Sequence, residues 1–321
     1  MNQDPVEGCA ISAVVCTRDR STYLAQCLTA LEKQSLPRRR YEVIVVDNGP
    51  SDDTKNVVTA FCERQPNFRY VEEPRTGLSI ARNTGIAATR TEIVAFTDDD
   101  AEPDPSWLER ILGRFEEFPT NVGIVGGDVT PVWEAERPPW LSDYLLRPLS
   151  AGLKWSTEPR VLRPGEWLVE VNSGYKKAAL LQVGKFPERL GRVGDLLLSG
   201  DGAINLLIQR AGYLLYYDPA ILVRHHIPPS RTTKDWFRRR SFWQGVSMNL
   251  LHRYVDETAH QLGFPGSPFR ARAWEEVVVP VSPAAWADLF DDRSTSDFVE
   301  QLIQLEQLGY LLESQSVVVG R

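Results

Sequence analysis

The chain is poor in cysteine, and its cysteines lack the spacings of a disulfide framework or a zinc finger. All four lie in the first fifth of the sequence, without a CxxC pair and without histidines at zinc-finger spacing. We therefore interpret Cys9, Cys16, Cys27 and Cys62 as reduced thiols of a protein core, as is typical of a reducing compartment.

Long apolar runs are also missing. No uninterrupted run approaches the roughly 20 residues that a membrane-spanning helix needs. The first ten residues have neither the positive start nor the apolar stretch of a secretory signal. We therefore expect a cytoplasmic protein without a transmembrane segment, whose contact with a membrane, if any, is peripheral and at the inner face.

An excess of positive charge is absent as well. The formal net charge is -7 and the pI is about 5.3, which argues against a broad nucleic-acid-binding surface. The hydrophobic share of 42% and the charged share of 25% are those of an ordinary globular protein. At 321 residues, the chain has room for one large domain with additions or for two small ones.

The first 127 residues alternate between short β-rich runs and segments with helical periodicity. Leu24, Cys27, Leu28 and Leu31 recur at the spacing of one helical face, and a second helix is expected from about Asp53 to Glu63. The expected strands are Ile11–Cys16, Glu42–Val46, Arg69–Val71, Ile93–Phe96 and Val122–Val125. This alternation predicts an α/β fold with a mostly parallel central sheet, helices on both faces, and ligands beyond the carboxyl ends of the strands.

The pattern changes after Gly127. The segment Pro131–Pro164 is rich in Pro, Trp and Leu, and we interpret it as an irregular, partly mobile cover. Strands are expected at Trp167–Val171 and Ala220–Val223. Helices are expected at Gly202–Arg210, from Arg231 to about Tyr254, and at Asp297–Leu312.

Polar residues follow several of the expected strands. Asp98, Asp99 and Asp100 are consistent with a Mg²⁺ or Mn²⁺ site or with an acidic turn that precedes a helix. Asp47 could bind a base or ribose, or could begin a turn. Arginines at three positions offer guanidinium groups to phosphate oxygens or are surface charges, namely Arg18, Arg20 and Arg82.

Several motifs, in order and spacing, resemble the family 2 glycosyltransferases with the Rossmann-like GT-A fold. These are Thr17-Arg18, VVDNGPSDDT at 45–54, GLSIARN at 77–83, FTDDD at 96–100, VGKF at 183–186, and Gly200-Asp201 with RAGY at 210–213. The resemblance covers roughly residues 10 to 245. It implies a nucleotide-sugar-binding half (1–127), an acceptor-binding half (128–230) of the same domain, and a mainly helical C-terminal extension (231–321).

The resemblance also assigns roles. Asp98 and Asp100 correspond to the acids of the DxD element, with Asp100 the preferred metal ligand, and His225 or its neighbour His226 would complete the metal shell. Asp201 corresponds to the catalytic base, although Gly200 replaces the acidic residue that usually precedes it. The donor-binding residues implied by the match are Thr17, Arg18, Arg20, Asp47, Arg82, Asn83, Asp98 and Asp99.

The sequence leaves the roles of two aromatic regions open. The stretch Arg231–Trp243 interleaves cations with aromatics and could bind a diphosphate, lie on an anionic membrane, or pack as a helix with solvated arginines. One or two of four tryptophans, Trp133, Trp140, Trp155 and Trp167, are expected to face an acceptor.

The expected activity is a Mn²⁺- or Mg²⁺-dependent, inverting transfer of a sugar from a nucleotide diphosphate donor, with UDP favoured, to a hydroxyl acceptor. The acceptor could be a glycan, a lipid-linked glycan or a small molecule, as in polysaccharide or glycoconjugate biosynthesis. An oligomer is possible. The alternatives are a catalytically inactive sugar-nucleotide-binding protein and a nucleotidyltransferase, which would carry a Gly-rich loop where this chain has Thr17–Ser21.

Overall fold

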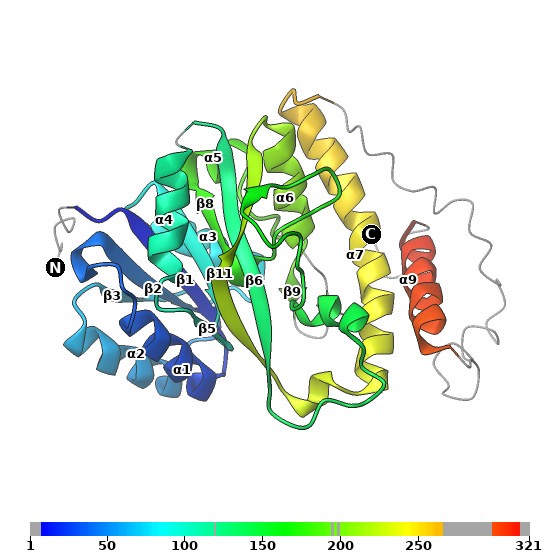
Figure 1. The fold of residues 1–321 in the computed structure, drawn as a ribbon, viewed down its shortest axis with the longest axis horizontal. Coiled ribbons are helices and arrows are strands. Elements are labelled where there is room, and N and C mark those ends of the chain that lie inside the picture. The colour runs from blue at the N-terminus through cyan, green and yellow to red at the C-terminus, as the bar shows by residue number, and fades with distance from the viewer. Residues whose placement is uncertain (1–7, 119, 194–195, 198–199, 266–296, 315–321) are drawn as a thin grey trace.

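A computed structural model describes residues 8–118, 120–193, 196–197, 200–265 and 297–314. Its centre is a nine-stranded sheet in the order β3-β2-β1-β4-β8-β6-β11-β5, with β7 paired to β11 (Figure 1). The strands of this sheet are β1 (Ile11–Thr17), β2 (Tyr41–Asp47), β3 (Phe68–Glu72), β4 (Ile93–Asp98), β5 (Ala101–Pro103), β6 (Val122–Trp133), β7 (Arg160–Val161), β8 (Ser173–Lys176) and β11 (Leu214–Ile227). A separate two-stranded ladder joins β9 (Arg192–Val193) to β10 (Leu196–Leu197).

Helices cover both faces of the sheet, as the alternation of strand and helix predicts. The α-helices are α1 (Ser21–Glu32), α2 (Asp52–Arg64), α3 (Leu78–Ala88), α4 (Trp107–Glu117), α5 (Lys177–Gln182), α6 (Asp201–Arg210), α7 (Lys234–Gln261) and α9 (Phe298–Ser314). Four short 3₁₀ turns are η1 (Arg38–Arg40), η2 (Asp143–Leu149), η3 (Glu170–Asn172) and η4 (Pro229–Arg231). Because successive side chains of a strand point to opposite faces of the sheet, each strand contributes to the apolar core on both faces.

The strand β1 illustrates this division. Ile11, Ala13 and Val15 point into a core shared with α1, α2 and α4. Val14, between them, points to the opposite face and packs with α3, α5 and α6. Burial on both faces explains why β1 and β2 are apolar along almost their whole length.

Most paired positions of the sheet are parallel, as predicted. The ladders β1–β2, β1–β4, β2–β3 and β6–β11 are parallel, whereas the short strands β5, β7 and β8 run antiparallel to their neighbours. The carboxyl ends of β1, β2, β4 and β11 therefore lie along one edge of the sheet. This edge brings together residues that are far apart in the sequence.

One expected strand is wrong. Trp167–Val171 does not form a strand, and the strand β8 begins only at Ser173. The backbone of Leu168 donates a hydrogen bond to Asn205 Oδ1 and accepts one from Asn205 Nδ2, so a side chain bonds the backbone where a strand partner would. Leu168, Val169 and Val171 are buried without pairing in a ladder.

Other elements of the second half are longer or more ordered than the pattern indicates. The expected strands Val122–Val125 and Ala220–Val223 are parts of β6 and β11, which reach Trp133 and Ile227. The segment Pro131–Pro164 contains η2 and β7, and its leucines at 141, 145, 146 and 149 are buried. It is therefore a packed layer over the carboxyl edge of the sheet.

The helices α7 and α9 confirm the expected helical extension. α7 crosses beside α6 and the ladder of β9, and α9 lies against its outer side (Figure 1). The boundary proposed at residue 127 falls inside β6, so the two proposed halves share that strand. Within the described residues, no helix is both long enough and apolar enough to span a membrane.

Candidate active site

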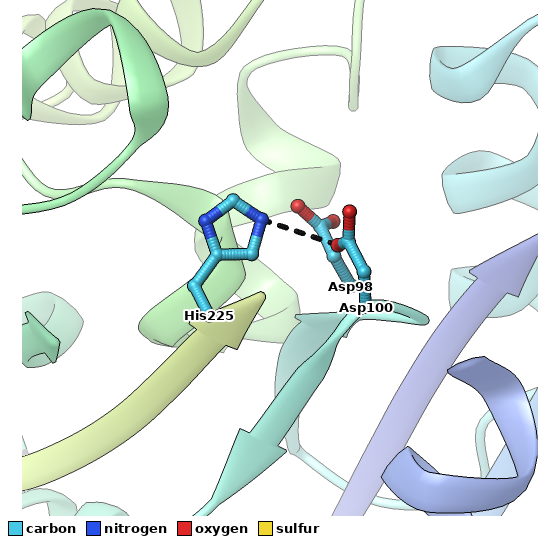
Figure 2. Close-up of side chains that lie close together, drawn as sticks. All are labelled: Asp98, Asp100 and His225. Atoms are coloured by element: carbon cyan, nitrogen blue, oxygen red, sulfur yellow. Dashed lines mark hydrogen bonds and ion pairs between the residues drawn. The ribbon is translucent and has the colours of Figure 1, made fainter. Parts of the chain in front are cut away.

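Three potential metal ligands converge at the carboxyl edge of the sheet. Asp98 is the last residue of β4, Asp100 lies in the turn before β5, and His225 lies on β11 opposite Ala101 of β5. One ligand atom from each of these three residues lies within 4.8 Å of the others (Figure 2). Asp100 and His225 are buried and Asp98 is partly exposed, so the cluster is reached from one side.

The hydrogen bonds of His225 fix the orientation of its ring. Nδ1 lies 3.0 Å from the carbonyl oxygen of Leu149, which can only accept, so Nδ1 carries the proton. Nε2 then faces Asp100 Oδ1 at 3.2 Å. A neutral ring would place two acceptors against each other there, and a second proton or a cation between them removes that conflict.

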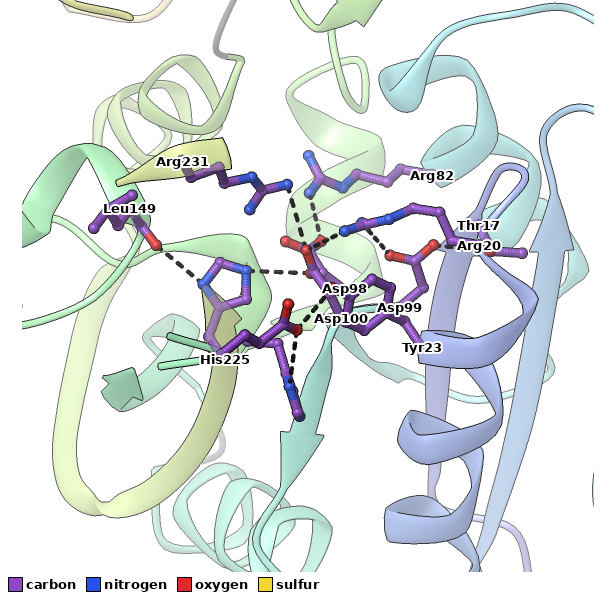
Figure 3. Close-up of polar contacts among 12 residues, drawn as sticks. Thr17, Arg20, Tyr23, Arg82, Asp98, Asp99, Asp100, Leu149, His225 and Arg231 are labelled. Carbon is purple, nitrogen blue, oxygen red and sulfur yellow. Dashed lines mark hydrogen bonds and ion pairs between the residues drawn. The ribbon is translucent and has the colours of Figure 1, made fainter. Parts of the chain in front are cut away.

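Arg20 binds two of the three aspartates. Its Nη1 donates to Asp99 Oδ1 and its Nη2 to Asp100 Oδ2, each at 2.7 Å (Figure 3). Thr17 Oγ1, at the end of β1, donates to Asp99 Oδ2 at 2.8 Å. Asp99 is therefore held by protein groups on both of its oxygens and lies on the side of the cluster away from His225.

The adjacent carboxyls of Asp99 and Asp100 are shifted in opposite directions. Burial raises the pKa of Asp99 to about 7, against the opposing charge of Arg20. Burial would also raise the pKa of Asp100, but the hydrogen bond from His225 and the charges of His225, Arg231 and Arg20 hold that pKa well below its usual range. Asp100 is thus kept ionised, as a metal ligand must be.

Two further arginines approach the aspartates. Arg231 Nη2 lies 3.4 Å from Asp100 Oδ2, and Arg82 Nη2, from α3, lies 3.5 Å from Asp98 Oδ1. Arg82 also pairs with the fully buried Glu170 at 3.1 Å. The cluster therefore combines carboxylates with guanidinium groups, a combination that can hold a metal ion beside phosphate oxygens.

A single cavity of about 1100 Å³ contains this cluster. The predicted residues that line it are Thr17, Arg18, Arg20, Arg82, Asp98, Asp99, Asp100 and His225. Arg18 is about half exposed and packs over Gly49 at the cavity mouth. The structure thus brings together most of the predicted donor-site residues.

Asp47 lies just behind the cavity wall. Its Oδ2 accepts hydrogen bonds from Tyr70 Oη at 2.9 Å and from the Ser51 amide, while its buried Oδ1 has no protein partner. Burial raises the pKa of Asp47. The next residue, Asn48, does line the cavity, and its side chain bonds the backbone at Glu73, Arg75 and Gly77.

The structure does not bring Asn83 to the cavity. The Asn83 amide both donates to the carbonyl and accepts from the N–H of Phe186, at 2.9 and 3.0 Å. It ties α3 to the loop at Val183–Phe186, in which Lys185 adopts the left-handed conformation with φ 67°. Asn83 of the GLSIARN motif thus bonds Phe186 of the VGKF motif, which explains why the two motifs lie together in the folded chain.

Asp201 is the first residue of α6, with Gly200 as the N-cap. The side chain of Asp201 lies outside the described part of the structure. Gly200 and Gly202, on either side of it, both line the cavity. Its backbone therefore lies at the cavity that contains the aspartates.

Different residues of the stretch Arg231–Trp243 fit different interpretations among those that the sequence leaves open. Arg231 and Arg240 line the cavity, Arg238 is buried and donates to Gln301, and Arg239 is exposed. Only part of this stretch is thus available to a diphosphate.

His226, the alternative to His225, points to Glu102 and Glu134 and not to Asp98.

The tryptophans are mostly structural. Trp140 packs against Phe237 and Phe298, and Trp155 packs against Trp167. Of the four, Trp167 lines the cavity. An exposed aromatic at the cavity is instead Tyr144, which is 61% exposed.

Sequence reasoning missed two groups that shape the site. Glu170 is buried against Arg82, and the Leu149 carbonyl sets the ring of His225. A glutamate within an apolar run, as in Trp167–Val171, is the signal that could have indicated a buried ion pair. A backbone carbonyl leaves no signal in the sequence.

Comparison with known structures supports the GT-A fold. A mannosyltransferase of Pyrobaculum calidifontis, solved in complex with GDP-Man and Mn²⁺, superposes with a TM-score of 0.59 at 19% sequence identity. The superposition covers 97% of this chain and 88% of the other. The likeness shows a GT-A fold, which carries the acidic cluster at the edge of its sheet.

The sequence comparisons support one family. Residues 12–162 match the family described as Glycosyl transferase family 2. A glucosyl-dolichyl phosphate glucuronosyltransferase of Haloferax volcanii is 26% identical over 249 residues, which cover 75% of this chain and 77% of the relative. A pre-mycofactocin glycosyltransferase of Mycobacterium tuberculosis is 32% identical over 256 residues, 78% of this chain and 49% of that protein, so this chain spans about half its length. These matches support a glycosyltransferase of family 2.

Proposed function

We propose that this protein transfers a sugar from a nucleotide diphosphate donor to a hydroxyl acceptor in a metal-dependent reaction that inverts the anomeric carbon. The observation that carries the proposal is the cluster of Asp98, Asp100 and His225, whose ligand atoms lie within 4.8 Å of one another. The preferred nucleotide is UDP, and the process served is polysaccharide or glycoconjugate biosynthesis at the cytoplasmic face of a membrane.

The donor set fits a divalent cation. Two carboxylates and one imidazole suit Mn²⁺, and the carboxylates alone suit Mg²⁺. The Leu149 carbonyl orients His225 in the way that outer groups orient metal-bound histidines. A bound cation would supply positive charge to the departing diphosphate.

The protein's own residues would supply the rest of the chemistry. Arg231 and Arg82 lie at the aspartates and would bind phosphate oxygens, so that negative charge is stabilised as the bond between the anomeric carbon and phosphate breaks. Thr17 and Arg18 would contact the nucleoside, and Asp47 and Asn48 would form the base end of the site.

Asp201 would act as the base. In the proposed reaction the acceptor oxygen attacks the anomeric carbon from the face opposite the diphosphate, its proton passes to the Asp201 carboxylate, and the bonding electrons leave with the diphosphate. This single displacement inverts the anomeric centre. The position of Asp201 at the start of α6, between two glycines that line the cavity, supports this role.

The acceptor is proposed to be a glycan or a lipid-linked glycan. The haloarchaeal relative is named for a glucosyl-dolichyl phosphate, and a small-molecule acceptor is the alternative. The transferase activity is tested by donor turnover. UDP-, GDP- and dTDP-sugars would be incubated with Mn²⁺, Mg²⁺ or EDTA, and the released nucleotide and the anomer of the first product would be measured.

Three proteins make this experiment specific: the intact protein, Asp100→Asn, and Asp52→Asn as a control at an exposed position outside the cavity. We expect turnover of one nucleotide sugar by the intact protein and by Asp52→Asn, and none in EDTA or by Asp100→Asn. Metal-dependent nucleotide binding without any turnover would favour an inactive binding protein. Release of pyrophosphate from a nucleoside triphosphate would favour a nucleotidyltransferase.

A further inference from the structure

The short turn η2 adjoins the aspartate cluster through its last residue. The Leu149 carbonyl oxygen lies 3.0 Å from Nδ1 of His225, and Figure 3 shows His225 between Leu149 and the aspartates. Thr17, at the end of β1, lies on the other side of the aspartates in the same view (Figure 3). The turn η2 is therefore separated from the residues that we propose for the nucleoside, at a part of the cavity that remains for the acceptor.

The sequence of η2 gives the turn one buried side and one side at the cavity. Leu145, Leu146 and Leu149 are buried and fix the turn to the core. Tyr144 and Arg147 are exposed and line the cavity. Because side chains three residues apart eclipse one another in a 3₁₀ helix, these two side chains stand on the same side of the turn. A flat ring and a cation thus face the cavity together.

The guanidinium group of Arg147 lies over two tryptophan rings. Its Cζ is 5.8 Å from the ring centre of Trp155 and 5.8 Å from that of Trp167. The two rings are held together, because Trp155 Nε1 donates a hydrogen bond to the Trp167 carbonyl at 2.7 Å. Contacts with ring faces do not engage the N–H groups of a guanidinium, which lie in its plane. The fork of Arg147 is therefore positioned by aromatic rings and can still bind an anion.

Arg147 differs from its charged neighbours because no acid balances its charge. Arg160 pairs with Glu166 at 2.7 Å, and Arg137 pairs with Asp143 at 2.8 Å. Among the residues that the structure describes, no carboxylate forms an ion pair with Arg147. One positive charge therefore remains beside the aromatic rings. A single guanidinium matches both the charge and the two oxygens of one carboxylate.

We propose that η2 and the tryptophan pair form an acceptor subsite for a sugar that carries a carboxylate. The carboxylate binds the N–H groups of Arg147, and the sugar ring packs against Tyr144. The link from η2 to His225 through Leu149 then holds this sugar beside the aspartate cluster. This inference rests on the proposed glycosyl transfer and specifies the charge of its acceptor.

The test uses two probes that differ only in the group at C6, methyl β-D-glucuronide and methyl β-D-glucoside. Their affinity for the full-length protein would be measured by ligand-observed NMR, in EDTA so that no metal ion binds the carboxylate. A charge-assisted hydrogen bond to arginine strengthens binding by roughly one order of magnitude at low salt. We therefore expect the glucuronide to bind at least about fivefold more tightly, and added KCl should reduce this preference.

Substitutions at Arg147 locate the preference. Arg147→Gln removes the charge and should reduce the preference to less than about twofold, whereas Arg147→Lys should keep part of it. Arg163→Gln is the matched control, because Arg163 is exposed, close in sequence to Trp167 and outside the cavity. It should keep the full preference. Tyr144→Ala should weaken the binding of both probes by a similar factor, since both carry the same ring. Thermal unfolding of each variant shows whether it is folded.

Equal binding of the two probes by the intact protein would overturn the proposal. So would a glucuronide preference that Arg147→Gln retains in full, since the carboxylate would then bind elsewhere. D-glucose 6-phosphate, measured in the same way, tests for a phosphate in place of the carboxylate. If Arg147 made this phosphate bind more tightly than the glucuronide, the carboxylate class would be wrong.

Mn²⁺-dependent binding of UDP, GDP and dTDP, measured on the same preparations, separates this inference from the proposed function. Equal binding of the two glycosides together with intact nucleotide binding overturns the acceptor class alone. A glucuronide preference without any nucleotide binding supports the subsite and contradicts the donor site.

Discussion

The two ends of the cavity are built by different means. At the aspartate end, Arg20, Asp99 and Asp100 are joined by hydrogen bonds of 2.7 Å, and they follow the paired strands β1 and β4. The helical end of the cavity is formed by the faces of α6, α7 and α9, where Arg210 pairs with Asp256 at 2.8 Å. The comparison teaches that acidic and basic groups concentrate where a sheet brings strand ends together, whereas the helical end depends on how the three helices pack.

The largest expected effect lies between the two ends, at Asp201. We predict that Asp201→Asn lowers the rate of sugar transfer by about 1000-fold, because a positioned general base contributes a factor of that order. Nucleotide binding should stay within about twofold, since the substitution leaves the aspartate end unchanged. Steady-state transfer and nucleotide titration together check this prediction. Unaltered transfer by the variant would remove Asp201 from the proposed mechanism.

A second prediction concerns Arg231, whose Nη2 lies 3.4 Å from Asp100 Oδ2. Arg231→Gln should lower kcat by about 100-fold, as is typical when one group that stabilises a leaving anion is removed. Arg231→Lys should recover part of the rate, because it restores the charge without the guanidinium geometry. Arg239→Gln, at an exposed position of the same stretch, is the control. Equal rates for the two glutamine variants would contradict a phosphate contact of Arg231.

The close packing of α7 and α9 gives a third prediction, which concerns the helical end of the cavity. Gly309→Ala places a methyl group against the backbone of Phe242, and we expect it to lower the free energy of unfolding by about 2 kcal/mol. Mn²⁺-dependent nucleotide binding should be kept, because Gly309 lies outside the aspartate end. Urea unfolding and nucleotide titration measure the two effects. A loss of nucleotide binding in a folded variant would show that the two ends are not independent.

The smallest effect is expected at Asn83, where the resemblance implies a ligand and the structure shows a tie to Phe186. Asn83→Ala removes two hydrogen bonds and should lower the free energy of unfolding by about 1–2 kcal/mol. Its effect on nucleotide affinity should be less than about threefold. A selective loss of nucleotide binding at unchanged stability would restore Asn83 to the donor site.

The sequence predicts the first half of the fold well. Apolar runs buried on both faces and helices with one apolar stripe are local patterns, and β1, β2, β4, α1 and α2 appear where they are expected. The second half depends on contacts between distant residues. The backbone of Leu168, for example, bonds the side chain of Asn205, so Trp167–Val171 does not become a strand despite its apolar pattern.

The same distinction applies to the site. Asp98, Asp100 and His225 follow strands and could be predicted to meet at one sheet edge, and the structure places them together. Asn83 and Asp47 have the right residue types in the right motifs, but their partners are the backbone of Phe186 and the Tyr70 hydroxyl. The helical end of the cavity has no motif, because its lining comes from helix faces that meet only in the folded chain.

The central claim is that Asp98, Asp100 and His225 form one metal centre that holds the donor diphosphate. Its most direct test is the affinity of the protein for UDP, GDP and dTDP with Mn²⁺ and with EDTA, before and after His225→Ala. The account predicts that Mn²⁺ raises the affinity for one of these nucleotides at least about tenfold and that the variant loses this increase. Equal affinity in Mn²⁺ and EDTA, or an increase that His225→Ala retains in full, would contradict it.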